Sequence, residues 1–145
     1  MEQTDTTELL RECNSGIKMG IDSIDEMLPD VKSEKLRAVM LQAKKEHCDL
    51  GDETHALLTD VGRPTKEPHP IAKGISWLKT EVKLAADRSD ETVADLITDG
   101  CDMGIKSLSS YLNRYTAADK DVRSITRRLI ASEEKLRDGV REFLR

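Results

Sequence analysis

The sequence predicts an all-α protein made of two copies of one helical hairpin, which together form a four-helix bundle. The stretch Cys13–Lys18 reads CNSGIK and returns 88 residues later as Cys101–Lys106, which reads CDMGIK. Charged residues make up 35% of the chain and aromatic residues only 3%, which is typical of long amphipathic helices around an aliphatic core. Apolar residues also recur at intervals of three and four in four long segments. Two hairpins that each bury one apolar stripe against the other satisfy all three observations.

A chain of 145 residues fits one domain with a single core. Within residues 1–145 we expect a first hairpin at 6–62, a crossover with a short fifth helix at 63–88, and a second hairpin at 89–145. The three cysteines are an odd number within apolar periodic segments, which is typical of reduced thiols. No apolar run has membrane length and no signal peptide is visible. We therefore expect a soluble cytoplasmic protein without a membrane partner.

The charges argue against a nucleic-acid partner. The 28 acidic and 23 basic residues are mixed along the chain and leave a net charge of −5, so no strong field favours a polyanion. One basic cluster lies at helical spacing, but it has no aromatic neighbours on which bases could stack. We interpret this cluster as a solvated helix face; its members are Lys120, Arg123, Arg127 and Arg128.

The first predicted helix runs from about residue 6 to 28. Thr6 or Thr7 can cap its start, and Pro29 follows where it must end. Gly16 and Gly20 each weaken a helix by roughly 1 kcal/mol relative to alanine, which indicates either close packing against a neighbour or tolerated surface positions. The apolar line of this helix is Leu10, Cys13, Ile17, Ile21, Ile24 and Leu28.

The second predicted helix begins after a cap at Ser33 and runs to about Val61. A glycine and then a proline follow it, Gly62 and Pro64, as is usual at helix ends. Its apolar line alternates steps of four and three and carries one imidazole in the middle. The line is Leu36, Met40, Ala43, His47, Leu50, Thr54, Leu57 and Val61.

The predicted crossover combines an extended stretch with a short helix. Three prolines between residues 63 and 70 prevent a helix there, and apolar residues at helical spacing from Ile71 to Ala85 then predict one that ends near Asp87. Together the two parts are long enough to run back along the whole second helix. The second and third bundle helices should therefore be parallel.

The second hairpin repeats the pattern of the first. Ser89 or Asp90 caps its first helix, and the turn lies at residues 117–119. The apolar line of its first helix is Val93, Ile97, Cys101, Gly104, Ile105, Leu108, Leu112 and Tyr115. The line of its second helix is Val122, Thr126, Leu129, Glu133, Leu136, Val140 and Phe143.

The order and spacing of several weak motifs resemble a known group. These motifs are Leu9-Leu10, Gly16, Gly62, Pro64, Gly74, Trp77–Lys79, Gly100–Asp102 and Tyr111-Leu112. The chain resembles the ferritin-like superfamily, and more closely a group of small bacterial four-helix-bundle proteins of unknown function near it. The resemblance implies a ferritin-like bundle with one long crossover, and the closer group brings no established activity.

A ferritin-type di-iron centre is not expected. Such centres use an inward carboxylate on the first and third helices and a Glu-x-x-His pair on the second and fourth. Glu46 and Glu134 can stand for two of the glutamates, but the residues three positions further on are Asp49 and Arg137. The inward positions of the first and third helices hold no carboxylate at that level. We therefore predict no di-iron oxidase.

One polar layer remains as a candidate site. Folding each hairpin about its turn places Gly16 level with Glu46 and His47, and Gly104 level with Glu133 and Glu134. A two-fold axis between the hairpins near mid-bundle then brings these six residues to one layer. One interpretation is a mononuclear iron or zinc site built from Glu46, His47 and either Glu133 or Glu134, with or without a thiolate. The other, which we favour, is a buried His47 paired with Glu133 across the core, with Cys13 and Cys101 as small apolar fillers.

The sequence contains no phosphate loop, nucleophile elbow, Cys-x-x-Cys or His-Glu-x-x-His motif. We therefore predict a non-catalytic bundle without a cofactor that acts through assembly, as a homo-oligomer or with a protein partner. The alternative is a metal-binding protein of ferritin-like descent with an altered site.

Overall fold

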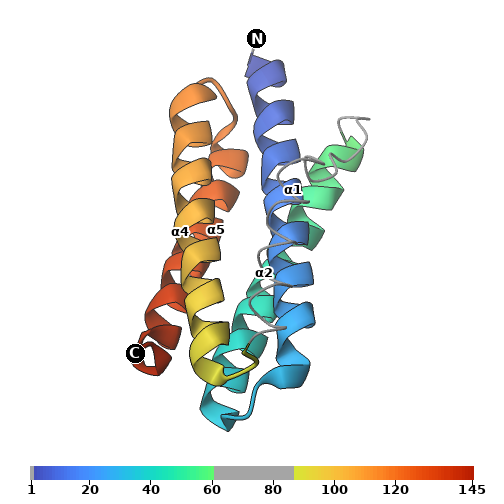
Figure 1. The fold of residues 1–145 in the computed structure, drawn as a ribbon. Helices are drawn as coiled ribbons and strands as arrows, with labels where there is room; N and C mark the ends of the chain where they lie inside the picture. Colours follow the sequence, from blue (N-terminus) through green and yellow to red (C-terminus); the bar gives the residue numbers. More distant parts are fainter. Residues whose placement is uncertain (1, 61–86) are drawn as a thin grey trace.

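The structure is a computed structural model that describes residues 2–60 and 87–145, and every long element in these ranges is a helix (Figure 1). The predicted crossover at 63–88 with its fifth helix lies outside the described residues apart from residues 87 and 88. Val61 and Gly62, at the end of the predicted second helix, also lie outside them. The elements are α1 (Glu2–Met27), η1 (Leu28–Asp30), α2 (Glu34–Asp60), α4 (Asp90–Arg114), α5 (Lys120–Val140) and η2 (Arg141–Phe143), where η marks a short 3-10 turn.

The four helices pack side by side, and α2 runs parallel to α4 (Figure 1). Along α2, Glu46 contacts Lys135 of α5 and Glu53 contacts Arg128, so α2 and α5 are antiparallel. Asp102 of α4 contacts Arg137 of α5, and Leu112 contacts Arg123, so α4 and α5 are antiparallel as well. The chain therefore leaves α2 at one end of the bundle and enters α4 at the other. This confirms the predicted parallel direction of the second and third bundle helices.

The predicted cap at Thr6 or Thr7 is wrong, because α1 begins at Glu2 and both threonines lie inside it. The side chains at this level serve the turn between α4 and α5 instead. The Thr6 hydroxyl accepts a hydrogen bond from the backbone N–H of Asp119 at 2.9 Å, and the Asp5 carboxylate accepts one from Ala117 at 3.0 Å. The first turns of α1 thus fix the second hairpin.

Serine caps begin α2 and α4 as predicted. The Ser33 hydroxyl accepts a hydrogen bond from the backbone N–H of Leu36, and the Ser89 hydroxyl accepts one from Thr92, both at 3.2 Å. The Asp90 carboxylate accepts two further bonds from backbone N–H groups just before α2. Since α4 starts at its own cap, it does not continue backwards into residues 87 and 88.

The core consists of two apolar clusters that lie toward opposite ends of the bundle. The cluster near the α1–α2 turn contains Ile24, Met27, Val31, Leu36, Met40, Ala43, Val93, Ala94, Leu96, Ile97, Cys101, Leu136 and Val140. The cluster near the α4–α5 turn contains Leu9, Leu10, Cys13, Ile17, Leu50, Leu58, Leu108, Ala118, Val122, Ile125 and Leu129. We call them the first-turn cluster and the second-turn cluster. The predicted line of α5 is buried through Val140, whereas in α2 Leu58 replaces the predicted Leu57 as the buried residue.

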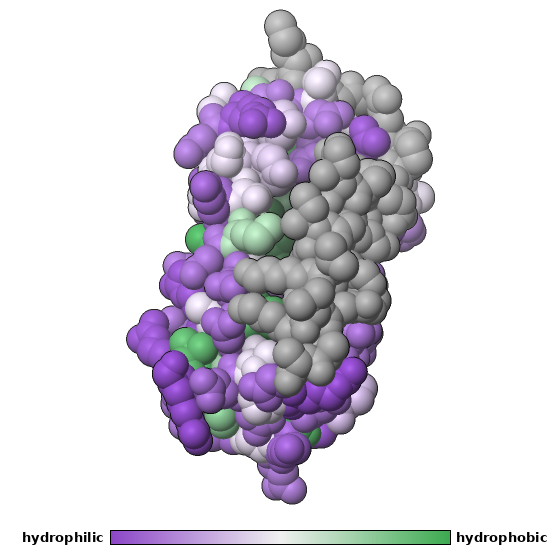
Figure 2. Space-filling model, viewed as in Figure 1, coloured by the Kyte–Doolittle hydropathy of each residue, from purple (hydrophilic) through white to green (hydrophobic). Residues whose placement is uncertain are grey.

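The outer surface is mostly hydrophilic on the side drawn in Figure 2. Among the described residues only two large apolar side chains are exposed, Leu41 and Met103, and isolated residues of this kind are normal on a protein surface. None of the helices in residues 2–60 and 87–145 is long and apolar enough to cross a membrane.

Candidate functional site

The centre of the bundle holds one buried pair of polar side chains, His47 from α2 and Glu133 from α5. The His47 Nε2 atom lies 2.9 Å from Glu133 Oε1. Only 1% of the His47 surface and 9% of the Glu133 surface are exposed. The pair belongs to neither apolar cluster and separates the first-turn cluster from the second-turn cluster. The predicted pairing of His47 with Glu133 across the core is present.

Both ring nitrogens of His47 face hydrogen-bond acceptors. Nδ1 lies 2.8 Å from the backbone carbonyl oxygen of Ala43, one turn earlier on α2. A carbonyl can only accept, so Nδ1 must carry a hydrogen atom and donate it. Nε2 faces the carboxyl group of Glu133, so a second proton must lie between these two groups. The pair therefore holds this proton either as imidazolium and carboxylate or as imidazole and carboxylic acid.

The surroundings favour the imidazolium form. Burial lowers the pKa of His47, but the hydrogen bond and the negative charge of Glu133, together with the bond to Ala43, outweigh burial and raise that pKa above 6.5. These contacts favour an ion pair, and its two side chains are only 1% and 12% exposed. Breaking such a pair by removing one partner leaves an unpaired buried group, which is strongly unfavourable.

Two glycines from the other helices make room for the pair. A Cβ atom on Gly20 of α1 would lie 3.0 Å from Cδ2 and 3.1 Å from Nε2 of His47. A Cβ atom on Gly104 of α4 would lie 3.5 Å from the carboxyl carbon of Glu133. Glycine at these positions lets all four helices meet in one layer.

The predicted register of α1 was wrong by one turn, because Gly20 rather than Gly16 lies at this level. A Cβ atom on Gly16 would have no neighbour within 4 Å. The chain continues through η1 after α1 ends and returns only then into α2, so the two helices do not fold symmetrically about the loop. Counting back equally from the loop therefore misplaces α1 against α2.

The two buried cysteines are protonated packing groups. Cys101 interacts with Glu133 of this layer, whereas Cys13 lies two turns before Gly20 on α1. Cys13 Sγ lies 3.2 Å from the Thr126 hydroxyl, which donates its own hydrogen to the carbonyl of Val122, so the thiol is the donor. Burial raises the pKa of Cys13 to about 11, although the bond to Thr126 lowers it in part. Burial, and then the charge of Glu133 and a bond to it, raise the pKa of Cys101. Neither thiol is a nucleophile at neutral pH.

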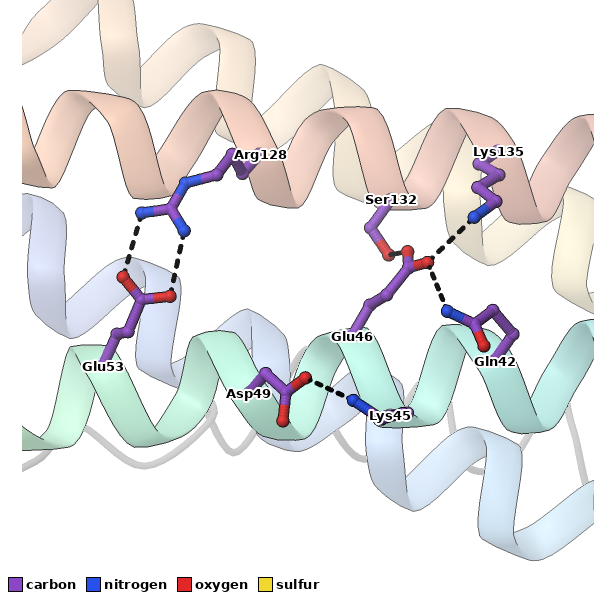
Figure 3. Close-up of polar contacts among 8 residues, drawn as sticks. All are labelled: Gln42, Lys45, Glu46, Asp49, Glu53, Arg128, Ser132 and Lys135. Atoms are coloured by element: carbon purple, nitrogen blue, oxygen red, sulfur yellow. Dashed lines mark hydrogen bonds and ion pairs between the residues drawn. The ribbon is translucent and has the colours of Figure 1, made fainter.

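Glu46 lies on the outer side of the α2–α5 contact rather than in the central layer (Figure 3). Its carboxylate accepts hydrogen bonds from Ser132 at 2.8 Å, from Lys135 at 3.0 Å and from Gln42 at 3.0 Å. Partial burial raises the pKa of Glu46, but these three bonds outweigh it and the pKa is lowered. Glu46 is therefore ionised, and both of its carboxylate oxygens accept hydrogen bonds from neighbouring side chains.

Of the four predicted metal ligands, the structure brings only His47 and Glu133 together. Glu46 points to Lys135 at the rim, and Glu134 is exposed on α5. Within residues 2–60 and 87–145, no three His, Cys, Asp or Glu side chains form a group that could hold a metal ion.

The basic cluster on α5 is only partly a solvated face. Arg128 makes a two-pronged ion pair with Glu53 of α2, with N–O distances of 2.9 and 3.0 Å (Figure 3). Arg123 is half-buried and donates to the carbonyl oxygens of Leu112 and Tyr115 at the end of α4. Two of the four predicted cluster members thus hold α5 against its neighbours, a role that spacing alone did not indicate.

A groove of about 310 Å³ runs between α2 and α5 on the outside of the bundle. Small and aliphatic residues line most of it, including Ala38, Val39 and Leu136, and Glu46 with its partners lies at one end. Gly139 brings the helices close here, since a Cβ atom at this position would lie 2.7 Å from Val39 Cγ1. The sequence alone does not reveal this groove, because the groove depends on how two distant helices cross.

Comparison of the chain with models of protein families, with curated proteins and with solved structures gives no match. Any function must therefore be argued from the geometry of the chain.

Proposed function

We propose that this chain is a non-catalytic helical bundle that acts by binding a protein surface, and that the surface is that of a second copy of itself. The observation that carries the proposal is the state of the central layer. His47 and Glu133 are bonded to each other and almost completely buried, and the thiols of Cys13 and Cys101 are buried and protonated. A substrate outside the bundle reaches none of these groups. We therefore assign the function of the chain to its outer surface.

The contact face in this proposal is the groove between α2 and α5. The exposed Ala38, the half-buried Val39 and the buried Leu136 line a recess that can take aliphatic side chains. Charges of both signs surround it. Lys35 pairs with Glu142 at 2.7 Å near one end, and the exposed ammonium of Lys135 lies at the other. A two-fold contact between copies sets positive charges of one against negative charges of the other.

A ferritin-like origin is part of the same proposal. Two hairpins whose second and third helices are parallel, as α2 and α4 are here, need one long connection, which ferritin-like bundles have. In this view the chain keeps the architecture and has lost the carboxylate and histidine ligands of a di-iron centre. A structural pair, His47 with Glu133, stands at the centre instead.

The test is the mass of the purified full chain in solution, measured by light scattering over a range of concentrations. The wild-type chain should be a dimer. Ala38→Glu, which places a charge in the groove, should be a monomer, and Ala56→Glu, at an exposed alanine on the far part of the same helix, should remain a dimer. A wild-type monomer at every concentration overturns the proposal, as does equal dissociation of both variants.

Elemental analysis tests the non-catalytic part separately. The untagged protein is measured before and after anaerobic incubation with ferrous iron and with zinc. The proposal expects no stoichiometric metal in either state. A stoichiometric metal that is lost in His47→Ala would overturn it in favour of the metal-binding alternative, whatever the oligomeric state.

A further inference from the structure

We infer that the folded bundle requires the proton shared by His47 and Glu133, so that release of this proton at alkaline pH opens the centre of the bundle. The inference concerns a built-in response to pH, and it is independent of which surface binds a partner. It begins from the two contacts of the imidazole ring, 2.8 Å to a carbonyl and 2.9 Å to a carboxyl oxygen.

No neutral tautomer of His47 fits this site while Glu133 is ionised. A neutral imidazole has one nitrogen that donates and one that only accepts. If Nδ1 keeps its hydrogen for Ala43, the lone pair of Nε2 faces a carboxylate oxygen 2.9 Å away. If Nε2 keeps its hydrogen, the lone pair of Nδ1 faces the Ala43 carbonyl. Either tautomer therefore replaces a buried hydrogen bond with a repulsion.

The neighbouring elements do not supply a replacement proton donor for the ring. At this level α1 presents Gly20, which has no side chain. On α4, Gly104 faces Glu133, and the thiol of Cys101 interacts with the same carboxylate. On α2 the negative charge of Glu46 favours the imidazolium, and Arg137 on α5 is directed to Asp102 at 3.2 Å. The charged form of His47 is therefore stabilised mainly by Glu133, and the ring has no other side-chain hydrogen-bond partner among the described residues.

The sign of the effect follows from proton binding. In the unfolded chain His47 releases its proton near pH 6.5, whereas in the folded chain its pKa is raised. The stabilisation is complete below pH 6.5 and is lost as the pH rises through the higher folded pKa. Between these two values the folded chain binds one more proton, so the unfolding constant rises ~tenfold per pH unit.

The useful range for a test ends near pH 8.5. The pKa of Cys13 is raised from 9.0 to about 11, and that of Cys101 is raised as well, so both thiols also hold protons in the folded state. These thiols add to alkaline destabilisation only where unfolded cysteines ionise, at pH values near ~8.5 and above. Below that pH, the pH dependence of the unfolding constant arises from histidine.

The experiment is urea unfolding of the full chain at fixed concentration between about pH 6.5 and 8.5, the range between the unfolded histidine and cysteine values. The wild-type unfolding constant should rise steeply, by up to ~tenfold per pH unit. Glu133→Gln should unfold with little pH dependence, because a glutamine amide can donate to neutral Nε2 and so removes the need for the proton. His55→Gln, at an exposed histidine on the same helix, should keep the wild-type dependence.

A wild-type constant that does not change over this range overturns the inference, and so does an equal slope in Glu133→Gln. If Glu133→Gln does not fold, nitrogen-15 NMR of the wild-type imidazole decides. An imidazole ring that keeps both protons above pH 6.5 supports the shared proton, and a ring that becomes neutral at or below pH 6.5 contradicts it.

Discussion

Two of the ion pairs that join α2 to α5 have the same length in opposite surroundings. The His47–Glu133 pair spans 2.9 Å at the centre of the bundle, with side chains that are 1% and 12% exposed. The Arg128–Glu53 pair also spans 2.9 Å, with side chains that are 49% and 47% exposed. Bond length alone therefore does not set how much an ion pair contributes to the stability of the fold. That contribution depends on how far water reaches the two partners.

The two pairs consequently do different things for the fold. If α5 slides along α2, Arg128 can swing to water or to another carboxylate at little cost. The same movement would leave His47 and Glu133 unpaired in the core, where an unpaired polar group costs several kcal/mol. The central pair therefore stabilises one register of α5 against α2, whereas the outer pair adds little to the choice of register. The variants below test this hypothesis.

The largest effect is expected when one member of the central pair is removed. Glu133→Ala leaves the ring of His47 without its acceptor and should reduce the free energy of unfolding by about 3–5 kcal/mol. Urea unfolding near pH 6.5 measures this loss. A loss below about 1 kcal/mol, the size expected for a surface pair, would place the central pair in the same class as Arg128–Glu53.

An intermediate effect is expected at the glycine that faces the pair. Gly20→Ala places a Cβ atom 3.0 Å from a ring that two hydrogen bonds hold in position, so we expect a loss of about 1–3 kcal/mol. Gly16→Ala is the matched control, one turn away on the same helix with open space around it, and should gain up to about 1 kcal/mol from better helix propensity. Thermal unfolding of the two variants separates these outcomes. A gain in both would mean that the layer is loosely packed.

The smallest effect is expected at the surface pair. A double-mutant cycle of Glu53→Ala and Arg128→Ala should give an interaction energy of at most about 1 kcal/mol. Added salt should reduce that energy further, because both side chains are half exposed. An interaction above 2 kcal/mol that salt does not change would contradict the assigned contrast, since ~0–1 kcal/mol is usual for such pairs.

The sequence could predict the four long helices and the partner of the central histidine. Steps of three and four placed His47 and Glu133 on the inner lines of α2 and α5, and a buried imidazole needs a polar partner at the same level. Serine caps at residues 33 and 89 were equally readable, because a cap depends on neighbours only three positions away.

The sequence could not predict contacts that depend on how helices rotate and shift against each other. Glu46 is adjacent to His47 in the chain, yet one step around a helix turns it to Lys135 at the outer rim. The one-turn shift that puts Gly20 at the centre arises in the α1–α2 connection. The periodic apolar pattern does not continue through this connection, so it cannot predict the shift. Thr6 has the chemistry of a helix cap, but its partner is 113 residues away.

The most direct test of the account is a double-mutant cycle at positions 47 and 133, read by urea unfolding near pH 6.5. His47→Leu and Glu133→Leu should each lose about 3–5 kcal/mol, because each leaves one buried polar group unpaired. The double variant should be about as stable as the wild-type chain, since two leucines leave no such group. Losses that add in the double variant would show that the two residues do not depend on each other, and would contradict a structural pair at the centre of this bundle.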